Sequence, residues 1–168
     1  ISGILDPVSK GRMINQTIYN ITQNNKINFI TPVHEGHIFG AWEIFLDNKY
    51  FGTGLRGFRY ECYNKEKYIN NPKIICSTHP HNIVMQFLSE TGIIGFIFYI
   101  TSFLFVSFIL LKKFISNQLK KKFINDYQVC ALVGIFVTLW PLTSTGSFYS
   151  NWLSIIYFIP VAFFLNKL

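Results

Sequence analysis

Two long stretches without a single charged residue constrain this 168-residue chain more than any other feature. One runs from Thr91 to Leu111 and the other from Tyr127 to Asn166, with a lysine-rich segment between them. About 20 residues of α-helix, each rising about 1.5 Å, cover the roughly 30 Å hydrocarbon core of a bilayer. A buried helix of a soluble protein rarely stays apolar on every face over that length. The pattern therefore predicts a membrane protein.

The two uncharged stretches differ in length, and this difference predicts three membrane helices. Residues 92–111 fit one crossing, whereas the second stretch is long enough for a hairpin of helices at about 128–140 and 152–165. Turn-forming residues separate these two helices, and Pro160 is expected to kink the last one. Both are short for a full crossing, so a tilted or re-entrant path stays open. The predicted fold class is an all-α membrane protein with polytopic transmembrane helices and a large, partly helical periplasmic loop.

The distribution of charge predicts the orientation of these helices. Residues 1–91 hold nine Lys and Arg against seven Asp and Glu, whereas the remainder holds six against Asp126 alone. Five of those six are the lysines at 112, 113, 120, 121 and 122. Short loops rich in Lys and Arg stay in the cytoplasm, so residues 1–91 and the turn at 143–151 are expected on the periplasmic side. The net charge of +7 then reflects topology, and nucleic acid is not an expected partner.

This topology divides the chain into a periplasmic segment at 1–91, a transmembrane helix at 92–111, a cytoplasmic basic loop at 112–126 and a transmembrane hairpin at 127–168. The chain opens on Ile1 without an apolar leader, yet its first segment is expected outside. We therefore expect it to be the C-terminal part of a longer multispanning protein of the bacterial inner membrane. Helices are expected at 13–28 and, from the spacing of apolar residues, at 37–47. The second would lie either on the membrane surface or against the rest of its segment.

The residue types best suited to chemistry lie in the periplasmic segment. It contains all four histidines of the chain: His34, His37, His79 and His81. His81 and Asn82 directly precede the predicted membrane helix, and Asn82 is suited to cap its N-terminus. An imidazole beside a helix N-terminus can act as a general base near neutral pH or hold a phosphate. A surface histidine next to a helix cap is the alternative interpretation.

The spacing of this motif resembles a known family. His81-Asn82, nine residues and then Gly92-x-x-Gly95 resembles the histidine motif of the O-antigen ligase family, which also includes O-antigen polymerases. The earlier stretch, with Trp42, Gly52-Thr-Gly54 and Phe58-Arg59, is similar to the family's large periplasmic loop. The resemblance covers roughly residues 36–165. It implies a membrane glycosyltransferase that needs neither a metal nor another cofactor.

The resemblance also implies the reaction and its partners. A glycan would be moved from undecaprenyl pyrophosphate to lipid A-core, in contact with membrane lipids. A polymerase with a growing glycan as acceptor, or a non-enzymatic component of polysaccharide export, are the alternatives. His81 would be the base for the acceptor hydroxyl, and cations would meet the leaving pyrophosphate. We expect Arg59 and Arg56 to supply them, because guanidinium matches phosphate bidentately; solvated loop charges are the alternative interpretation.

The chain departs from the family's pattern at one position. Family members commonly carry an arginine about four residues before the loop tryptophan, where this chain has His37-Ile38. A protonated His37 would be a weaker substitute. Asn82 and Glu90 complete the expected substrate-binding set, with Glu90 orienting His81 or contacting the acceptor. The turn at 144–152 is expected on the same side of the membrane as His81.

Three further patterns point elsewhere. The string Gly52-Thr-Gly54-Leu-Arg-Gly57 has the spacing of a dinucleotide-binding loop, but it follows an amphipathic helix where that fold needs a buried strand. Cys76, His79 and His81 are residue types that bind zinc, yet no fourth ligand is evident, and no metal is expected. In an oxidising periplasm Cys62 and Cys76 are better suited to a disulfide, which would stabilise the loop by about 3 kcal/mol.

Overall fold

The computed structural model describes residues 30–118, 125–142 and 146–166. Within these ranges the chain is helical and has no β-strand, as expected for an all-α fold. The helices are α4 (Pro32–Asp47), α5 (Gly57–Asn64), α6 (Glu66–Ile69), α7 (Ile83–Gln118), α8 (Asp126–Thr138) and α9 (Asn151–Leu165). The helix expected at 13–28 lies outside the described residues, as do Lys120, Lys121 and Lys122.

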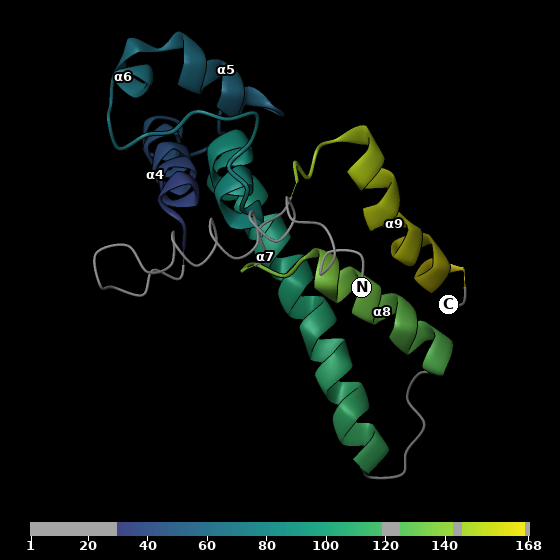
Figure 1. Ribbon diagram of the computed structural model, residues 1–168. Helices are drawn as coiled ribbons and strands as arrows, with labels where there is room; N and C mark the ends of the chain where they lie inside the picture. Colours follow the sequence, from purple (N-terminus) through teal and green to yellow (C-terminus); the bar gives the residue numbers. More distant parts are fainter. Residues whose placement is uncertain (1–29, 119–124, 143–145, 167–168) are drawn as a thin grey trace, which may run out of the picture.

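The helices form two groups along α7. Figure 1 shows α4, α5 and α6 gathered around the upper end of α7, α8 beside its middle, and α9 next to α8. Helix α8 packs against both α7 and α9, and the hydroxyl of Tyr99 on α7 donates to the carbonyl of Leu139 just after α8, at 2.8 Å. The polar segment therefore packs at the N-terminal end of α7, and α8 packs at its middle.

Helix α4 begins five residues before the predicted start at His37. Thr31 caps its N-terminus by accepting a hydrogen bond from the backbone of His34, and Pro32 occupies the first turn. Its C-terminus is held by Asp47, whose carboxylate accepts hydrogen bonds from Lys67 at 2.7 Å and from the hydroxyl of Tyr68. These two donors lower the pKa of Asp47.

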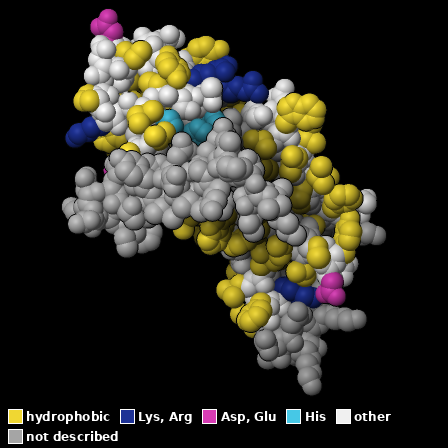
Figure 2. Space-filling model, viewed as in Figure 1, with side chains coloured by type: hydrophobic (Ala, Val, Ile, Leu, Met, Phe, Trp, Pro, Cys, Tyr) yellow, Lys and Arg dark blue, Asp and Glu magenta, His cyan; other side chains and the backbone are white. Residues whose placement is uncertain are grey.

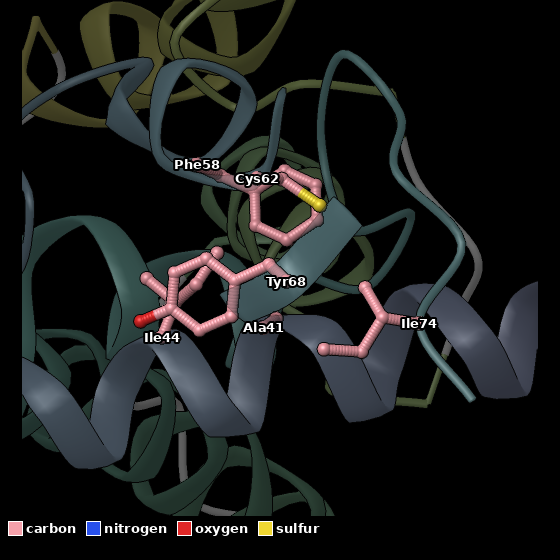
Figure 3. Packing of buried hydrophobic residues seen from close by; sticks show 6 residues of the cluster. All are labelled: Ala41, Ile44, Phe58, Cys62, Tyr68 and Ile74. Atoms are coloured by element: carbon pink, nitrogen blue, oxygen red, sulfur yellow. The ribbon is translucent and has the colours of Figure 1, made fainter. Parts of the chain in front are cut away.

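A small core joins α4 to the loop that follows it. Its members are nearly inaccessible and come from α4, α5, α6 and the connection to α7: Ala41, Ile44, Phe58, Cys62, Tyr68 and Ile74. Figure 3 shows these side chains filling the space over one face of α4. Helix α4 therefore packs on its own segment through Ala41 and Ile44, whereas Trp42 and Leu46 of the predicted apolar face stay exposed, and its position at a membrane surface stays a prediction. The structure also joins Cys62 and Cys76 by the expected disulfide, which ties α5 to the connection that leads to His81.

Helix α7 is 36 residues long and contains one interruption, at Gly92, where φ is 65° and ψ is −166°. Among the described residues it is the one helix long and apolar enough to cross a membrane by length and composition, over Ile83–Ser116. The span predicted at 92–111 lies inside it. Helices α8 and α9 are shorter apolar helices.

The boundaries of the last two helices shift slightly from the prediction. Helix α8 begins and ends two residues earlier than predicted, because Asn125 and Gln128 form a reciprocal capping box at its start. Helix α9 begins one residue before the predicted start, and Pro160 lies inside it as expected.

Candidate functional site

The interruption in α7 is filled by the loop that follows α4. The backbone N–H groups of Thr53 and Gly54 donate to the carbonyls of Ser89 and Glu90, at 3.0 and 2.9 Å. These carbonyls end the upper part of α7 and would otherwise lack partners.

The same loop also satisfies the lower part of α7. The N–H groups of Ile93 and Ile94 donate to the carbonyls of Lys49 and Tyr50, at 2.8 and 3.5 Å. Residues 49–54 therefore cap both helical ends at the break. The carbonyl groups before Gly92 and the N–H groups after it each have a hydrogen-bond partner in this loop.

Two glycines of the family-like motifs make this insertion fit. Gly52 and Gly92 both have positive φ, 67° and 65°. A Cβ on Gly92 would lie 2.3 Å from the carbonyl oxygen of Tyr50, and one on Gly52 would lie 2.4 Å from the carbonyl carbon of Glu90. Any other residue at either position would force the two backbones apart. The close backbone contact between residues 49–54 and α7 therefore explains why glycine occupies both positions.

Below the histidine motif, two buried side chains tie three segments together. Glu90 is fully buried and accepts hydrogen bonds from the backbone of Phe58 at 3.4 Å and from Gln86 Nε2 at 3.1 Å. Gln86 also donates to Ser147 Oγ at 2.9 Å and accepts from the backbone N–H of Phe148 at 2.9 Å. This network joins α5, α7 and the connection before α9. The expected role of Glu90 in orienting His81 is not supported, because its carboxyl is directed to Phe58 and Gln86.

The four histidines converge at the upper end of α7. The ring of His81 lies 5.6 Å from that of His34, 5.1 Å from His37 and 4.0 Å from His79, measured between centroids. His34 and His37 come from α4, whereas His79 and His81 come from the connection before α7. Figure 2 shows the histidines on a face that also carries Lys and Arg side chains nearby.

Local hydrogen bonds orient several of these rings. The Nδ1 of His37 lies 2.7 Å from the carbonyl oxygen of Ile75. Since a carbonyl only accepts, this nitrogen carries a proton. His81 itself has φ of 57°, an uncommon backbone conformation for a residue with a side chain, and its Nε2 lies 3.3 Å from Ser77 Oγ.

The surroundings of His81 favour the neutral ring. Burial, together with weaker repulsion from His79, His37 and His34, lowers the pKa of His81 to about 4. An imidazole in this environment is uncharged at neutral pH and is able to accept a proton.

His81 borders a pocket of about 280 Å³. The lining combines polar and apolar side chains from three segments: Ile30, Thr31, His34, Ile38, His81, Asn82 and Leu142. Asn82 caps α7 as predicted, because its Oδ1 accepts from the backbone of Met85 at 3.1 Å. Its Nδ2 donates to the carbonyl of Pro141 at 3.1 Å, which brings the connection after α8 to the pocket.

The two arginines expected to meet a pyrophosphate do not line this pocket. Arg56 donates to the carbonyl of Tyr149 at 2.9 Å and to Asn151 Oδ1 at 3.2 Å, so it holds the start of α9. The guanidinium of Arg59 lies over the ring of Tyr60, at 5.0 Å from its centroid. The prediction for Arg56 therefore missed a structural role in joining two segments.

The zinc-like pattern is not assembled. Cys76 forms a disulfide with Cys62, so it has no thiolate to bind a metal. In the described part of the chain, no three His, Cys, Asp or Glu side chains are grouped as metal ligands.

Gln86 and Ser77 contact site residues, but neither was predicted from the sequence. Gln86 and Glu90 are four residues apart at the start of an otherwise apolar helix, so they lie on one face. That pairing was a signal for a buried polar network. Ser77 gave no such signal, because its contact with His81 depends on the turn between them.

In its described residues the chain belongs to a class of helical proteins that have an apolar helix long enough to cross a membrane and a histidine pocket at the N-terminal end of that helix. Residues 40–100 match the family model described as O-Antigen ligase. This segment includes the His81-Asn82 and Gly92-x-x-Gly95 motifs, so the chain's resemblance to the O-antigen ligase family is confirmed over these residues. His34 and His37 lie outside the matched range. No curated protein and no solved structure matches the chain significantly.

Proposed function

We propose that the protein is a membrane glycosyltransferase that moves a glycan from a lipid pyrophosphate carrier to an acceptor hydroxyl. One observation carries this proposal: His81 lies in the family-matched segment and borders a pocket. The donor class, undecaprenyl pyrophosphate, and the acceptor, lipid A-core, follow from the family resemblance. The O-antigen ligase and polymerase members of this family share the chemistry.

The proposed reaction needs one base and no redox partner. The neutral imidazole of His81 removes the proton of the acceptor hydroxyl, whose oxygen attacks the anomeric carbon of the donor sugar. The bond between that carbon and the pyrophosphate oxygen breaks, and the lipid pyrophosphate leaves as an anion. We propose that Arg59, and His37 when protonated, stabilise its charge. Arg56 is a weaker candidate, because the Tyr149 carbonyl and Asn151 already accept from its guanidinium.

The proposed topology places this chemistry on the periplasmic side of the bacterial inner membrane. Residues 1–91 would be periplasmic, residues 92–111 would cross the membrane, and the lysine-rich loop at 112–126 would face the cytoplasm. Residues 127–168 would form the hairpin that returns to the periplasmic side near 143–151. The support is the charge asymmetry of the sequence together with the length and apolar character of α7.

Replacement of His81 tests the catalytic proposal. In cells that depend on this protein for surface glycan, the His81→Ala and His81→Gln variants should lose glycan transfer while they insert and accumulate normally. Glycan on lipid A-core is measured by gel electrophoresis of the lipopolysaccharide. A matched control replaces an exposed residue at the end of α5, Asn64→Ala, which should leave transfer unchanged. Normal surface glycan with His81→Ala would refute the role of His81 as base.

The same cells distinguish a ligase from a polymerase. Loss of a ligase leaves long glycan chains on the lipid carrier and none on lipid A-core. Loss of a polymerase leaves lipid A-core with single repeat units. If the His81 variants still bind glycan and the surface glycan of the cells is unchanged, the non-enzymatic alternative is favoured.

A further inference from the structure

Four large side chains near the interruption of α7 are exposed. Tyr50 is 72% exposed, Phe51 77%, Leu55 67% and Trp152 81%. Exposed apolar residues scattered singly need no explanation, but a group of them at one position usually marks a contact surface. These four come from two segments almost 100 residues apart in the sequence.

Hydrogen bonds place the two segments at one level along α7. Residues 49–54 are bonded into the interruption at Gly92, which fixes the position of Tyr50 and Phe51 along the helix. Arg56, which directly follows Leu55, donates to Tyr149 and to Asn151, the first residue of α9. Trp152 is the next residue. The four side chains therefore belong to one patch, which we call the interruption patch.

The length of α7 shows where this level lies relative to a membrane. Helix α7 breaks at Gly92, and the rings of Phe87 and Tyr99, on either side of the break, stack at 5.0 Å, so only the part after Gly92 is counted as a straight span. The part before Gly92 carries the buried polar side chains Gln86, Ser89 and Glu90. The part from 93 to 111 is uncharged, ends at Lys112-Lys113 and extends about 28 Å, which matches the core. The membrane boundary therefore falls at Gly92.

We propose that the interruption patch is seated in the headgroup region of the outer leaflet, so its partner is the phospholipid interface itself. This proposal rests on the membrane topology proposed above and not on the glycosyltransferase activity. Trp and Tyr favour that region because their rings have both an apolar body and a polar edge. The patch fixes the depth of the loop that closes the helix break. His81 lies eleven residues before Gly92, on the N-terminal side of the interruption.

Depth-dependent fluorescence quenching tests the proposal in the full chain, reconstituted in phosphatidylethanolamine and phosphatidylglycerol vesicles. Trp42→Phe and Trp140→Phe leave Trp152 as the single reporter. A second protein replaces all three tryptophans with Phe and carries Phe51→Trp as its reporter. Lipids brominated near the headgroup end of the chain should reduce both signals by about twofold more than lipids brominated near the chain terminus. A control protein retains only Trp42, on α4, and should show no quenching by either lipid.

Two outcomes would overturn the proposal. Quenching of both reporters by aqueous iodide alone would place the patch in water. Protection of both from iodide and from brominated lipid would mean that another protein segment covers the patch. Extraction of the protein from membranes by alkaline carbonate would instead refute the proposed topology. The expected quenching by headgroup-proximal bromine, in a protein that transfers no glycan, would refute only the proposed function.

Discussion

A Cβ atom on Gly92 would lie 2.7 Å from the backbone nitrogen of Gly52, so α7 and the loop after α4 meet backbone to backbone. This contact links two glycines that are 40 positions apart in the sequence. It also explains why the helix that leads from the histidine pocket breaks at this residue, since the loop takes up the hydrogen bonds that the break leaves open.

Replacement of either glycine should therefore destabilise the protein strongly. Gly92→Ala and Gly52→Ala each add backbone overlap to a strained positive φ, and we expect a loss of about 3 kcal/mol or more. Gly54→Ala is the matched control: its φ is also positive, at 89°, but a Cβ there meets nothing within 4 Å. That variant should lose only about 1 kcal/mol. Thermal unfolding of the purified protein in detergent measures all three, and equal losses would contradict the proposed close packing.

The pH dependence of transfer should follow the depressed pKa of His81. Since that pKa is about 4, the ring stays neutral between about pH 6.5 and 4, where an ordinary histidine would be protonated. The transfer rate should therefore persist as the pH is lowered from about 7 to 5 and decline only near pH 4. Over the same range the unfolded chain binds the extra proton, so the contribution of His81 to stability declines from about pH 6.5 towards 4.

The measurement is a pH–rate profile with purified donor and acceptor. His79→Ala removes one repelling neighbour of His81 and so raises its pKa. The acid limb of the profile should therefore move to higher pH. An acid limb near pH 6.5, the ordinary value for histidine, would contradict the assignment of His81 as a base with a lowered pKa.

Loss of the buried Gln86 side chain should disturb the site without touching the histidines. Gln86→Leu removes the partners of Glu90, Ser147 and the Phe148 backbone, and each buried polar group left unpaired costs about 1–3 kcal/mol. Both thermal stability and transfer should fall. Glu66→Gln, which alters an exposed carboxylate at the start of α6, serves as the control and should change neither. Normal stability of Gln86→Leu would show that the network does not hold the segments together.

The disulfide between Cys62 and Cys76 should stabilise the segment before His81. Replacement of both with serine should cost about 3 kcal/mol in unfolding free energy, according to the loop-entropy relation. Thermal unfolding without reductant measures the loss, and reductant should lower the unaltered protein to the same value. Cys130→Ser is the control, because Cys130 is free and exposed. An unchanged melting temperature of the double variant would refute this stabilising role.

Much of the fold could be predicted because its signals are local. The uncharged run after Thr91, the Asn82 cap and the pairing of Cys62 with Cys76 follow from composition, spacing and the expected compartment. The start of α4 at Pro32 was missed, because its cap at Thr31 lies outside the apolar pattern that defined the predicted helix. Arg56 and Glu90 were assigned to substrate from their chemistry alone. Their partners, Tyr149 and Phe58, are distant in sequence and could not be identified from it.

Composition and spacing along the chain were enough to predict helices, a membrane-length apolar helix after a histidine motif, and the resemblance of that motif to the O-antigen ligase family. These properties depend on periodicity, charge and residue spacing, which are read along the chain. Three relationships appear only in the folded chain: the Gly52 loop enters the break at Gly92, Gln86 and Glu90 join three segments, and His34, His37 and His79 surround His81. Such contacts depend on the packing of backbones and rings from separate segments, which leave no periodic signal in the sequence.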